Sequence, residues 1–219
     1  MNSPKIVFED DYLVAVDKEA GHLVHPADEP QPDDRVVMKE LRDHLGQHVY
    51  LSHRLDRPTT GLLLLAKDRN SANALGLAFD NRKVKKVYQA IVVGHPTSDQ
   101  WLCEEPIQKT PEAPLREAST RFKVLQRLPR NLSLIEARPH TGRYHQIRRH
   151  LLHSGYPIIG DFRYSGIETC LAQSAELGTQ DQMLLRCHQL IFPHPHYGDP
   201  LSLTAPPHEL FEKLLKNAR

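Results

Sequence analysis

One carboxylate lies between two arginines in the segment HRLDRPTTG, residues 53–61. Asp56 has Arg54 and Arg57 as neighbours and precedes the apolar run 62–65. A turn that leads into a buried strand has a rigid backbone, so we expect the Asp56 side chain to be firmly placed. Nearby cations favour the charged form of a carboxylate, which suits a nucleophile or a base toward a C–H group. The structural alternative is a helix cap or a surface ion pair.

A second group of residues suited to chemistry lies in TGRYHQIRRHLLHSG, residues 141–155. If a helix begins near His145, then Arg148 and Arg149 lie in its first turn, where free backbone N–H groups also attract phosphate or carboxylate. Arg143 precedes this turn. The pattern indicates an anion site, with solvated positive side chains as the alternative.

Tyr88 is the third candidate, in the segment KKVYQAIVVG. On a strand, Lys86 and Tyr88 point to the same face, so a cation and an aromatic ring would lie side by side. Such a pair is a platform on which an unpaired base can stack. A half-buried core tyrosine is the alternative.

Histidine pairs raise the question of a metal site. His150 and His153 are three residues apart, and His194 and His196 flank a proline. Neither pair has a suitably spaced carboxylate or third ligand. We therefore expect no metal site, and expect these histidines to be solvated, in turns or in contact with phosphate.

The composition is that of a soluble globular protein. The chain has 219 residues, of which 39% are hydrophobic and 25% charged. Its three cysteines form no CxxC pair, which excludes a zinc ribbon and a disulfide framework. No stretch approaches the roughly 18 apolar residues of a membrane span, and no basic and apolar leader is present. We expect a cytoplasmic protein without a membrane segment.

The charge is unevenly distributed, although the net charge is only +1. Residues 1–50 contain five Lys or Arg and eleven Asp or Glu, whereas residues 137–160 contain four Arg and no acidic residue. A second basic cluster, RKVKK, occupies residues 82–86. Clustered cations in a nearly neutral chain indicate a local footprint for a polyanion, most commonly a phosphate backbone.

Apolar periodicity and turn signals predict more strands than helices. The predicted strands are 6–8, 12–16, 61–66, 87–93, 118–125, 132–137, 188–192 and 201–204. The predicted helices are 37–45, capped by Asp33 or Asp34, then 70–79, 146–154 and 209–216, and residues 165–182 form the longest predicted loop. Short turns between neighbouring strands favour an α+β fold with a largely antiparallel sheet. We expect one domain over residues 1–219.

Four segments together resemble a known family. EDDYLVAVDKEAGHLVHP, HRLDRPTTGLLLLAK, KVYQAIVVG and TGRYHQIRRHLLHSGYPIIGD are similar, in this order, to the motifs of the RluA-type family of RNA pseudouridine synthases. The resemblance covers almost the whole chain. Residues 36–61 look most like the TruC branch, whose substrate is a uridine near the junction of the acceptor and T stems of tRNA.

The resemblance implies roles for particular residues. Asp56 matches the catalytic aspartate that is essential for detaching uracil from C1′ and rejoining it through C5. Arg148 matches the basic residue that pairs with this aspartate, and Tyr88 matches the tyrosine that stacks on the target base. Arg54 matches the arginine that fills the space left by the extruded nucleotide in some relatives. Further RNA contacts are expected from Arg57, Lys86, Arg143, His145 and Arg149.

The resemblance also implies a fold and a mode of action. The fold is a bent, mainly antiparallel mixed sheet with flanking helices and a central RNA-binding cleft. Members need no metal and no organic cofactor, and we expect a monomer without a separate S4 domain. Two positions depart from the family pattern: Glu19 replaces the usual proline, and Arg186 replaces the usual histidine of Leu-His-Ala.

Three classes of function remain open from the sequence. The first is an isomerase that acts on tRNA, or on 23S ribosomal RNA. The second is a non-catalytic RNA-binding protein, which would not need Asp56, Tyr88 and Arg148 together. The third is a histidine-rich metalloenzyme.

Overall fold

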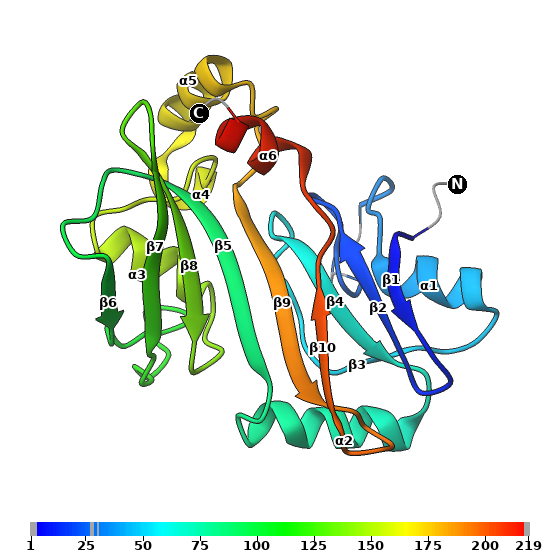
Figure 1. Ribbon diagram of the computed structural model, residues 1–219. Helices are drawn as coiled ribbons and strands as arrows, with labels where there is room; N and C mark the ends of the chain where they lie inside the picture. Colours follow the sequence, from blue (N-terminus) through cyan, green and yellow to red (C-terminus); the bar gives the residue numbers. More distant parts are fainter. Residues whose placement is uncertain (1–3, 27–28, 30, 217–219) are drawn as a thin grey trace. The chain divides into compact units, whose positions relative to one another are not determined.

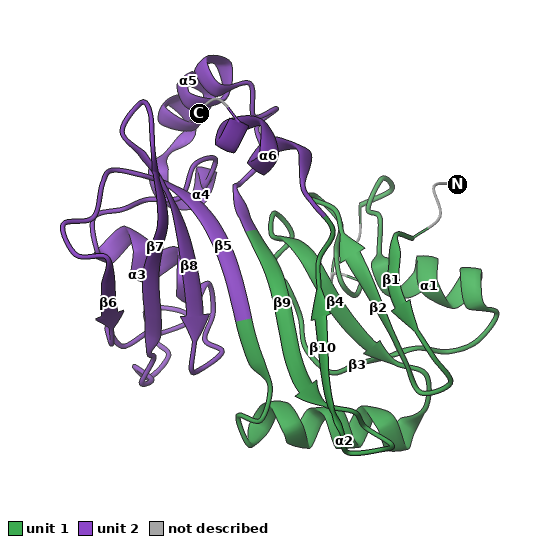
Figure 2. Cartoon of the chain, in the orientation of Figure 1, with its two compact units in different colours: residues 1–86, 186–206 green, residues 87–185, 207–219 purple. Residues whose placement is uncertain are grey.

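The computed structural model describes residues 4–26, 29 and 31–216. Internal contacts divide the chain into two compact units (Figure 2). Unit 1 comprises the chain up to Lys86 together with Arg186–Pro206, and unit 2 comprises Val87–Leu185 together with the chain from Pro207 onward. Figure 1 labels the helices and strands of both units. The expectation of a single domain stays a prediction.

Over its described residues, unit 1 forms a sheet with two helices. Its strands are β1 (Ile6–Glu9), β2 (Leu13–Lys18), β3 (Tyr50–Leu51), β4 (Thr60–Ala66), β10 (Pro200–Thr204) and most of β9 (Leu185–Pro193). Its helices are α1 (Val37–Leu45) and α2 (Arg69–Asp80). The strand order is β1-β2-β4-β9, with β3 also paired to β4 and β10 to β9. These pairs are antiparallel except β4 with β9, which is parallel.

The core of unit 1 is built around β4. The four leucines of residues 62–65 have no exposed surface, which explains the uninterrupted apolar run in this strand. Helix α2 packs on β4 and β3. It begins at Asp68, whose carboxylate caps the helix by accepting the Ser71 N–H at 2.9 Å.

Unit 2, as far as the structure describes it, is a second antiparallel group of strands with four helices. Its strands are β5 (Lys85–Val93), β6 (Gln100–Cys103), β7 (Thr120–Leu128) and β8 (Leu132–Pro139), in the order β5-β8-β7-β6. Its helices are α3 (Gln146–His153), α4 (Phe162–Ser165), α5 (Ile167–Leu177) and α6 (Glu209–Lys216). Helix α3 packs on β7 and β8, and leucines of α6 join a buried cluster with Ile91 and Leu134.

The predicted class, an α+β protein with a mainly antiparallel mixed sheet, is confirmed. Each predicted strand and helix has a counterpart, with ends shifted by a few residues. Two local predictions were wrong. Residues 165–182 contain helix α5 and are not one long loop, and α1 begins after Val36 without a side-chain cap. Strands β3 and β6 and helix α4 were not predicted.

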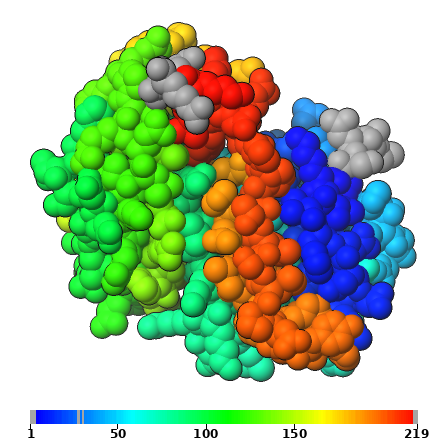
Figure 3. Space-filling view, viewed as in Figure 1, coloured from blue at the N-terminus to red at the C-terminus, as the bar shows by residue number. Residues whose placement is uncertain are grey.

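Strand β10 lies at the surface of unit 1. Its side chains are mostly exposed or half-buried, and its orange spheres form part of the face seen in Figure 3. In the part of the chain that the structure describes, every helix is too short or too polar to span a lipid bilayer.

Candidate active site

The Asp56 loop, residues 52–59, connects β3 to β4 in unit 1. The Thr59 N–H closes a turn by donating to the Asp56 carbonyl oxygen at 3.0 Å. Leu55 and Thr59 are buried on either side of Asp56. The Asp56 side chain is half-buried, whereas Arg54 and Arg57 are exposed. The loop is thus anchored on both sides of a carboxylate that keeps access to solvent.

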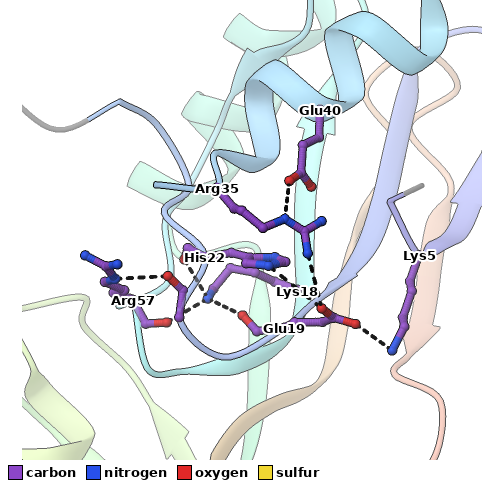
Figure 4. A network of polar contacts seen from close by, with 8 residues as sticks. Lys5, Lys18, Glu19, His22, Arg35, Glu40 and Arg57 are labelled. Carbon is purple, nitrogen blue, oxygen red and sulfur yellow. Dashed lines mark hydrogen bonds and ion pairs between the residues drawn. The ribbon is translucent and has the colours of Figure 1, made fainter. Parts of the chain in front are cut away.

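Lys18, at the end of β2, holds the backbone beside Asp56. Its side chain is 2% exposed, and its Nζ donates to the carbonyl oxygens of Glu19, His22 and Arg57 at 2.8, 2.9 and 3.0 Å. Figure 4 shows these bonds converging on one ammonium. Burial lowers the pKa of Lys18 to about 7, while the charge of Asp56 acts in the opposite direction. Lys18 therefore fixes the backbone next to Asp56 through its hydrogen bond to Arg57, and it also interacts electrostatically with the Asp56 carboxylate.

The segment after Lys18 is fastened to the same loop. The Gly21 N–H donates to the Arg57 carbonyl oxygen at 3.0 Å, and the Arg57 Nε donates back to the Gly21 carbonyl oxygen at 2.9 Å. Glu19, which replaces the expected proline, pairs with Lys5 at 2.7 Å, and Arg35 approaches it to 4.0 Å (Figure 4). Ion pairs thus hold this segment where a proline ring would stiffen it.

In unit 2, the basic segment is organised around Gln146, the first residue of α3. The Gln146 Oε1 accepts from the Thr141 hydroxyl at 2.6 Å and from the Arg143 N–H at 2.9 Å. Its Nε2 donates to the Ser119 carbonyl oxygen at 3.0 Å. This buried amide fixes the loop that presents Arg143 and His145.

Arg143, His145 and Arg149 all lie at the N-terminal end of α3, as predicted. Arg143 Nε donates to the Glu117 carbonyl oxygen at 3.0 Å, and Arg149 Nη1 donates to the Gln108 carbonyl oxygen at 2.7 Å. Backbone carbonyls orient these guanidinium groups without cancelling their charge. The other N–H groups of each fork remain able to bind phosphate.

Arg148 forms a buried, bidentate pair with Asp161. Its Nε and Nη2 lie 2.8 and 2.7 Å from the two carboxylate oxygens, and its side chain is 5% exposed. Its Cζ lies 5.1 Å from the centre of the Tyr164 ring. The guanidinium is therefore held rigidly within unit 2. Its pairing with Asp56, which belongs to unit 1, stays a prediction.

Tyr88 and Lys86 both lie on β5, two residues apart. Tyr88 is 8% exposed and pairs across the strands with Ala137 of β8. Lys86 is half-buried, and burial lowers its pKa, opposed by the nearby Cys187. Burial disfavours the charged form of Lys86, so it is less suited to a phosphate contact than Arg143 or Arg149. Its RNA contact and the stacking role of Tyr88 stay predictions.

The expectation that the histidine pairs are solvated was wrong for His150 and His194, which are buried. Both ring nitrogens of His150 have partners, the Thr120 hydroxyl and the Glu105 carbonyl oxygen, each at 2.9 Å. His194 Nε2 lies 2.8 Å from an Asp10 carboxylate oxygen. Within the described residues, no three His, Cys, Asp or Glu side chains are grouped so that they could hold a metal ion.

Lys18, Gln146 and Asp161 were not identified as parts of the site from the sequence. The signal available for Lys18 was its position in the sequence, because it is the last residue of a strand that is mostly apolar and buried. Asp161 follows the buried Ile158 and Ile159, which suggests a buried carboxylate in need of a cation.

The chain is similar to proteins of one known family. A family model for RNA pseudouridylate synthase matches residues 12–153. The chain is 37% identical to tRNA pseudouridine synthase C of Pasteurella multocida, over 92% of this chain and 90% of the relative. It is 34% identical to the protein of that name from Vibrio cholerae, over 96% and 94% of the two chains.

A solved structure supports the same assignment. Human RNA pseudouridylate synthase domain containing 4 is 26% identical, with a TM-score of 0.78 over 98% of this chain and 92% of that one. The resemblance of the four sequence motifs is thereby confirmed. The chain belongs to the family of RNA pseudouridylate synthases.

Proposed function

We propose that this pseudouridine synthase acts on tRNA, at a uridine in the region of the acceptor and T stems. Similarity to tRNA pseudouridine synthases C along more than nine-tenths of the chain supports this choice of substrate. The anchored, half-buried Asp56 is the single structural observation that carries the proposal, because RNA binding alone does not need a carboxylate fixed in this way. The protein acts in the cytoplasm as a monomer.

The reaction is an isomerisation and needs no net oxidant or reductant. The bond between uracil N1 and the ribose C1′ breaks, and the detached ring turns. A bond forms between C5 and C1′, the hydrogen of C5 leaves as a proton, and N1 gains a proton. The product therefore has the same composition as the uridine.

Asp56 is the catalytic residue at the reacting nucleotide in this proposal. Its carboxylate acts in the ionised form, and Arg148 supports that form from α3. The rigid pair of Arg148 with Asp161 limits the positions that the guanidinium can take. Tyr88 stacks on the target uracil, and Arg54 occupies the space that the extruded nucleotide leaves.

The phosphate backbone is bound by the remaining cations. They are Arg57 and Lys86 of unit 1 with Arg143, His145 and Arg149 of unit 2. Arg143 and Arg149 are the best suited, since only backbone carbonyls engage them in the contacts described above. Lys18 is a positioning residue, because it acts on Asp56 through the backbone of Arg57.

The choice of RNA is tested with purified protein and two sets of transcripts, unmodified tRNAs and fragments of 23S ribosomal RNA. We expect pseudouridine in the acceptor and T-stem region of a tRNA, mapped by reverse transcription after chemical derivatisation. RNA from cells that lack the gene should lose the same pseudouridine. Modification of the ribosomal fragments alone would overturn the tRNA assignment, and modification of neither set would overturn the proposed function.

A further inference from the structure

Tyr144 is an aromatic side chain that stays at the surface beside the candidate site. Its side chain is 37% exposed, between Arg143 and His145 in the sequence. The His145 ring stacks on it, with 3.8 Å between ring centres and 19° between ring planes. Arg163 lies over the same ring, with its Cζ 5.8 Å from the ring centre. Tyr144 thus has a stacked ring and a cation as its neighbours, not an apolar core.

The His145 ring, which stacks on Tyr144, is held in place by a series of contacts. His145 adopts φ 52° and ψ 31°, a left-handed conformation that is unfavourable for a residue other than glycine. Its Nδ1 lies 3.0 Å from the Tyr164 hydroxyl, and the Tyr164 ring lies against Arg148. The support for Tyr144 is therefore connected to the buried pair of Arg148 and Asp161.

Arg163 is the neighbour of the Tyr144 ring that a flat ligand can displace. Its Cζ lies 5.8 Å from the ring centre, whereas the His145 ring is stacked on Tyr144 with 3.8 Å between ring centres. Arg163 is exposed, and exposed side chains change rotamer on the picosecond to nanosecond scale. Its guanidinium can move outward and then cover a base that has stacked on Tyr144.

The charge around Tyr144 favours a nucleic acid over other flat ligands. Residues 137–160 contain no acidic side chain. Arg143 and Arg149, at the same end of α3, are oriented by backbone carbonyls and can take the phosphates on either side of a stacked base. A neutral aromatic ligand would gain nothing from these cations.

We propose that Tyr144 and Arg163 form a stacking site for one unpaired base of the RNA substrate, in addition to the target uracil assigned to Tyr88. The inference rests on the proposed function, since the ligand is a nucleotide of the same RNA. Every base has a π-face, so the site selects an unpaired nucleotide at this place and not a particular base.

The test compares three variants at one position. Tyr144→Phe keeps the ring, Tyr144→Leu keeps an apolar cover on His145 without a π-face, and Tyr144→Ala removes both. We expect Tyr144→Phe to bind a tRNA transcript within about twofold of wild type, and the other two to bind about 5- to 100-fold more weakly. The slope of log K against log salt should not change, because no phosphate contact is removed.

Two results would overturn the stacking site. The first is wild-type affinity in Tyr144→Leu. The second is a loss confined to Tyr144→Ala that accompanies a lower melting temperature, because the ring would then only support the loop. A cross-linking experiment tests the stacking site independently. Ultraviolet light should join an RNA nucleotide to the tryptic peptide that spans Tyr144 to Arg148.

The controls separate this inference from the proposed function. Wild-type protein that neither binds nor modifies tRNA contradicts the proposed function itself. Wild-type protein that modifies tRNA, together with an unaffected Tyr144→Leu, contradicts the stacking site alone. Arg163→Gln should weaken binding less than Tyr144→Leu, because the base keeps the aromatic face on which it stacks; a larger loss would make Arg163 a phosphate contact instead.

Discussion

Lys18 lies at a place where burial disfavours its charged form and lowers its pKa to about 7. Three carbonyl oxygens within 3.0 Å stabilise its ammonium, and one of them belongs to Arg57, next to Asp56 in the chain. A carboxylate that must act on a precisely placed nucleotide needs a fixed backbone, since a displacement of about 1 Å can cost about 100-fold in rate. Lys18 provides this fixation from a strand about forty residues earlier in the sequence.

Replacement of Lys18 by methionine tests this role. Lys18→Met removes a donor from three carbonyl oxygens, of which, among the described residues, only the Arg57 oxygen keeps another donor, the Gly21 N–H. We therefore expect the free energy of unfolding to fall by about 2 to 4 kcal/mol. Turnover should fall as well, because the Asp56 loop loses its anchor. Urea unfolding and single-turnover rates measure the two effects.

Lys5→Met is the matched control for this variant. The Lys5 side chain is 64% exposed and forms a surface pair with Glu19, so its loss should change stability by less than about 1 kcal/mol. Equal effects of Lys18→Met and Lys5→Met would show that the buried bonds do not position the loop.

His53, in the same loop, makes stability depend on pH. Its Nε2 accepts the Leu64 N–H at 2.9 Å, and burial lowers its pKa from 6.5 to about 3. Because the pKa is lower in the folded than in the unfolded state, the stabilisation is complete above pH 6.5. It is lost progressively as the pH falls toward 3.

The variant His53→Gln keeps a hydrogen-bond acceptor that does not titrate. Between pH 7 and pH 5 we expect wild type to lose about 1 to 2 kcal/mol more unfolding free energy than this variant. Denaturant titrations at the two pH values measure the difference. Parallel losses in both proteins would mean that His53 is not held neutral in the folded state.

At the scale of elements, β4 meets β9 at a glycine. Gly61 pairs with Cys187, has a φ of +97°, and a Cβ in its place would overlap the Cys187 carbonyl oxygen. We expect Gly61→Ala to lower the free energy of unfolding by about 3 kcal/mol or more, through both backbone strain and the clash.

A second glycine of unit 1 provides the control. Gly76 lies in α2, and a Cβ there meets open space. Gly76→Ala should therefore raise stability by about 0.5 to 1 kcal/mol, because alanine favours a helix. If the two alanine variants had similar stability, the close approach of β4 and β9 would be in doubt.

The elements that were predicted are those whose own residues carry the signal. The continuous leucines of β4 are such a local pattern. Helix α5 was missed because its buried face carries Cys170 and Ser174, while Ile167 and Leu171 are exposed. Leu177 is the one leucine or isoleucine of α5 that is buried, which is too little for the usual apolar periodicity to show.

The residues of the candidate site also fall into two groups, those that were predicted from the sequence and those that were missed. Asp56 and the cations around α3 were predicted because their neighbours in the sequence suggest a chemistry that the family resemblance also implies. The groups that hold them were missed, since they act across the fold. Lys18 reaches a carbonyl 39 residues away in the sequence, and the partner of Arg148 is 13 residues away. Such pairings are not visible in local spacing.

At the scale of the molecule, the excess of acidic residues near the start of the chain is largely neutralised within unit 1. Glu19 pairs with Lys5, Glu40 with Arg35, Asp34 with Arg57 and Glu9 with Lys67. Around α3, by contrast, Arg143 and Arg149 are oriented by carbonyl groups that carry no net charge. A protein of net charge +1 can therefore present a local positive field to an RNA.

The claim that depends on the whole molecule is that Asp56 performs chemistry on RNA. Asp56→Asn keeps the size of the side chain and removes its charge. Fold and RNA affinity should persist, and binding can tighten because a negative charge near phosphate is lost. Asp99→Asn is the control, since Asp99 is a surface carboxylate, 76% exposed, that pairs with Arg127.

The most direct measurement is the release of tritium from tRNA labelled at uracil C5, because joining the ring through C5 must displace that hydrogen. We predict release by wild type and by Asp99→Asn without added metal or nucleotide. Asp56→Asn should bind the same tRNA and release only background tritium. An Asp56→Asn variant that releases tritium as fast as wild type would contradict the assignment of Asp56 as the catalytic residue.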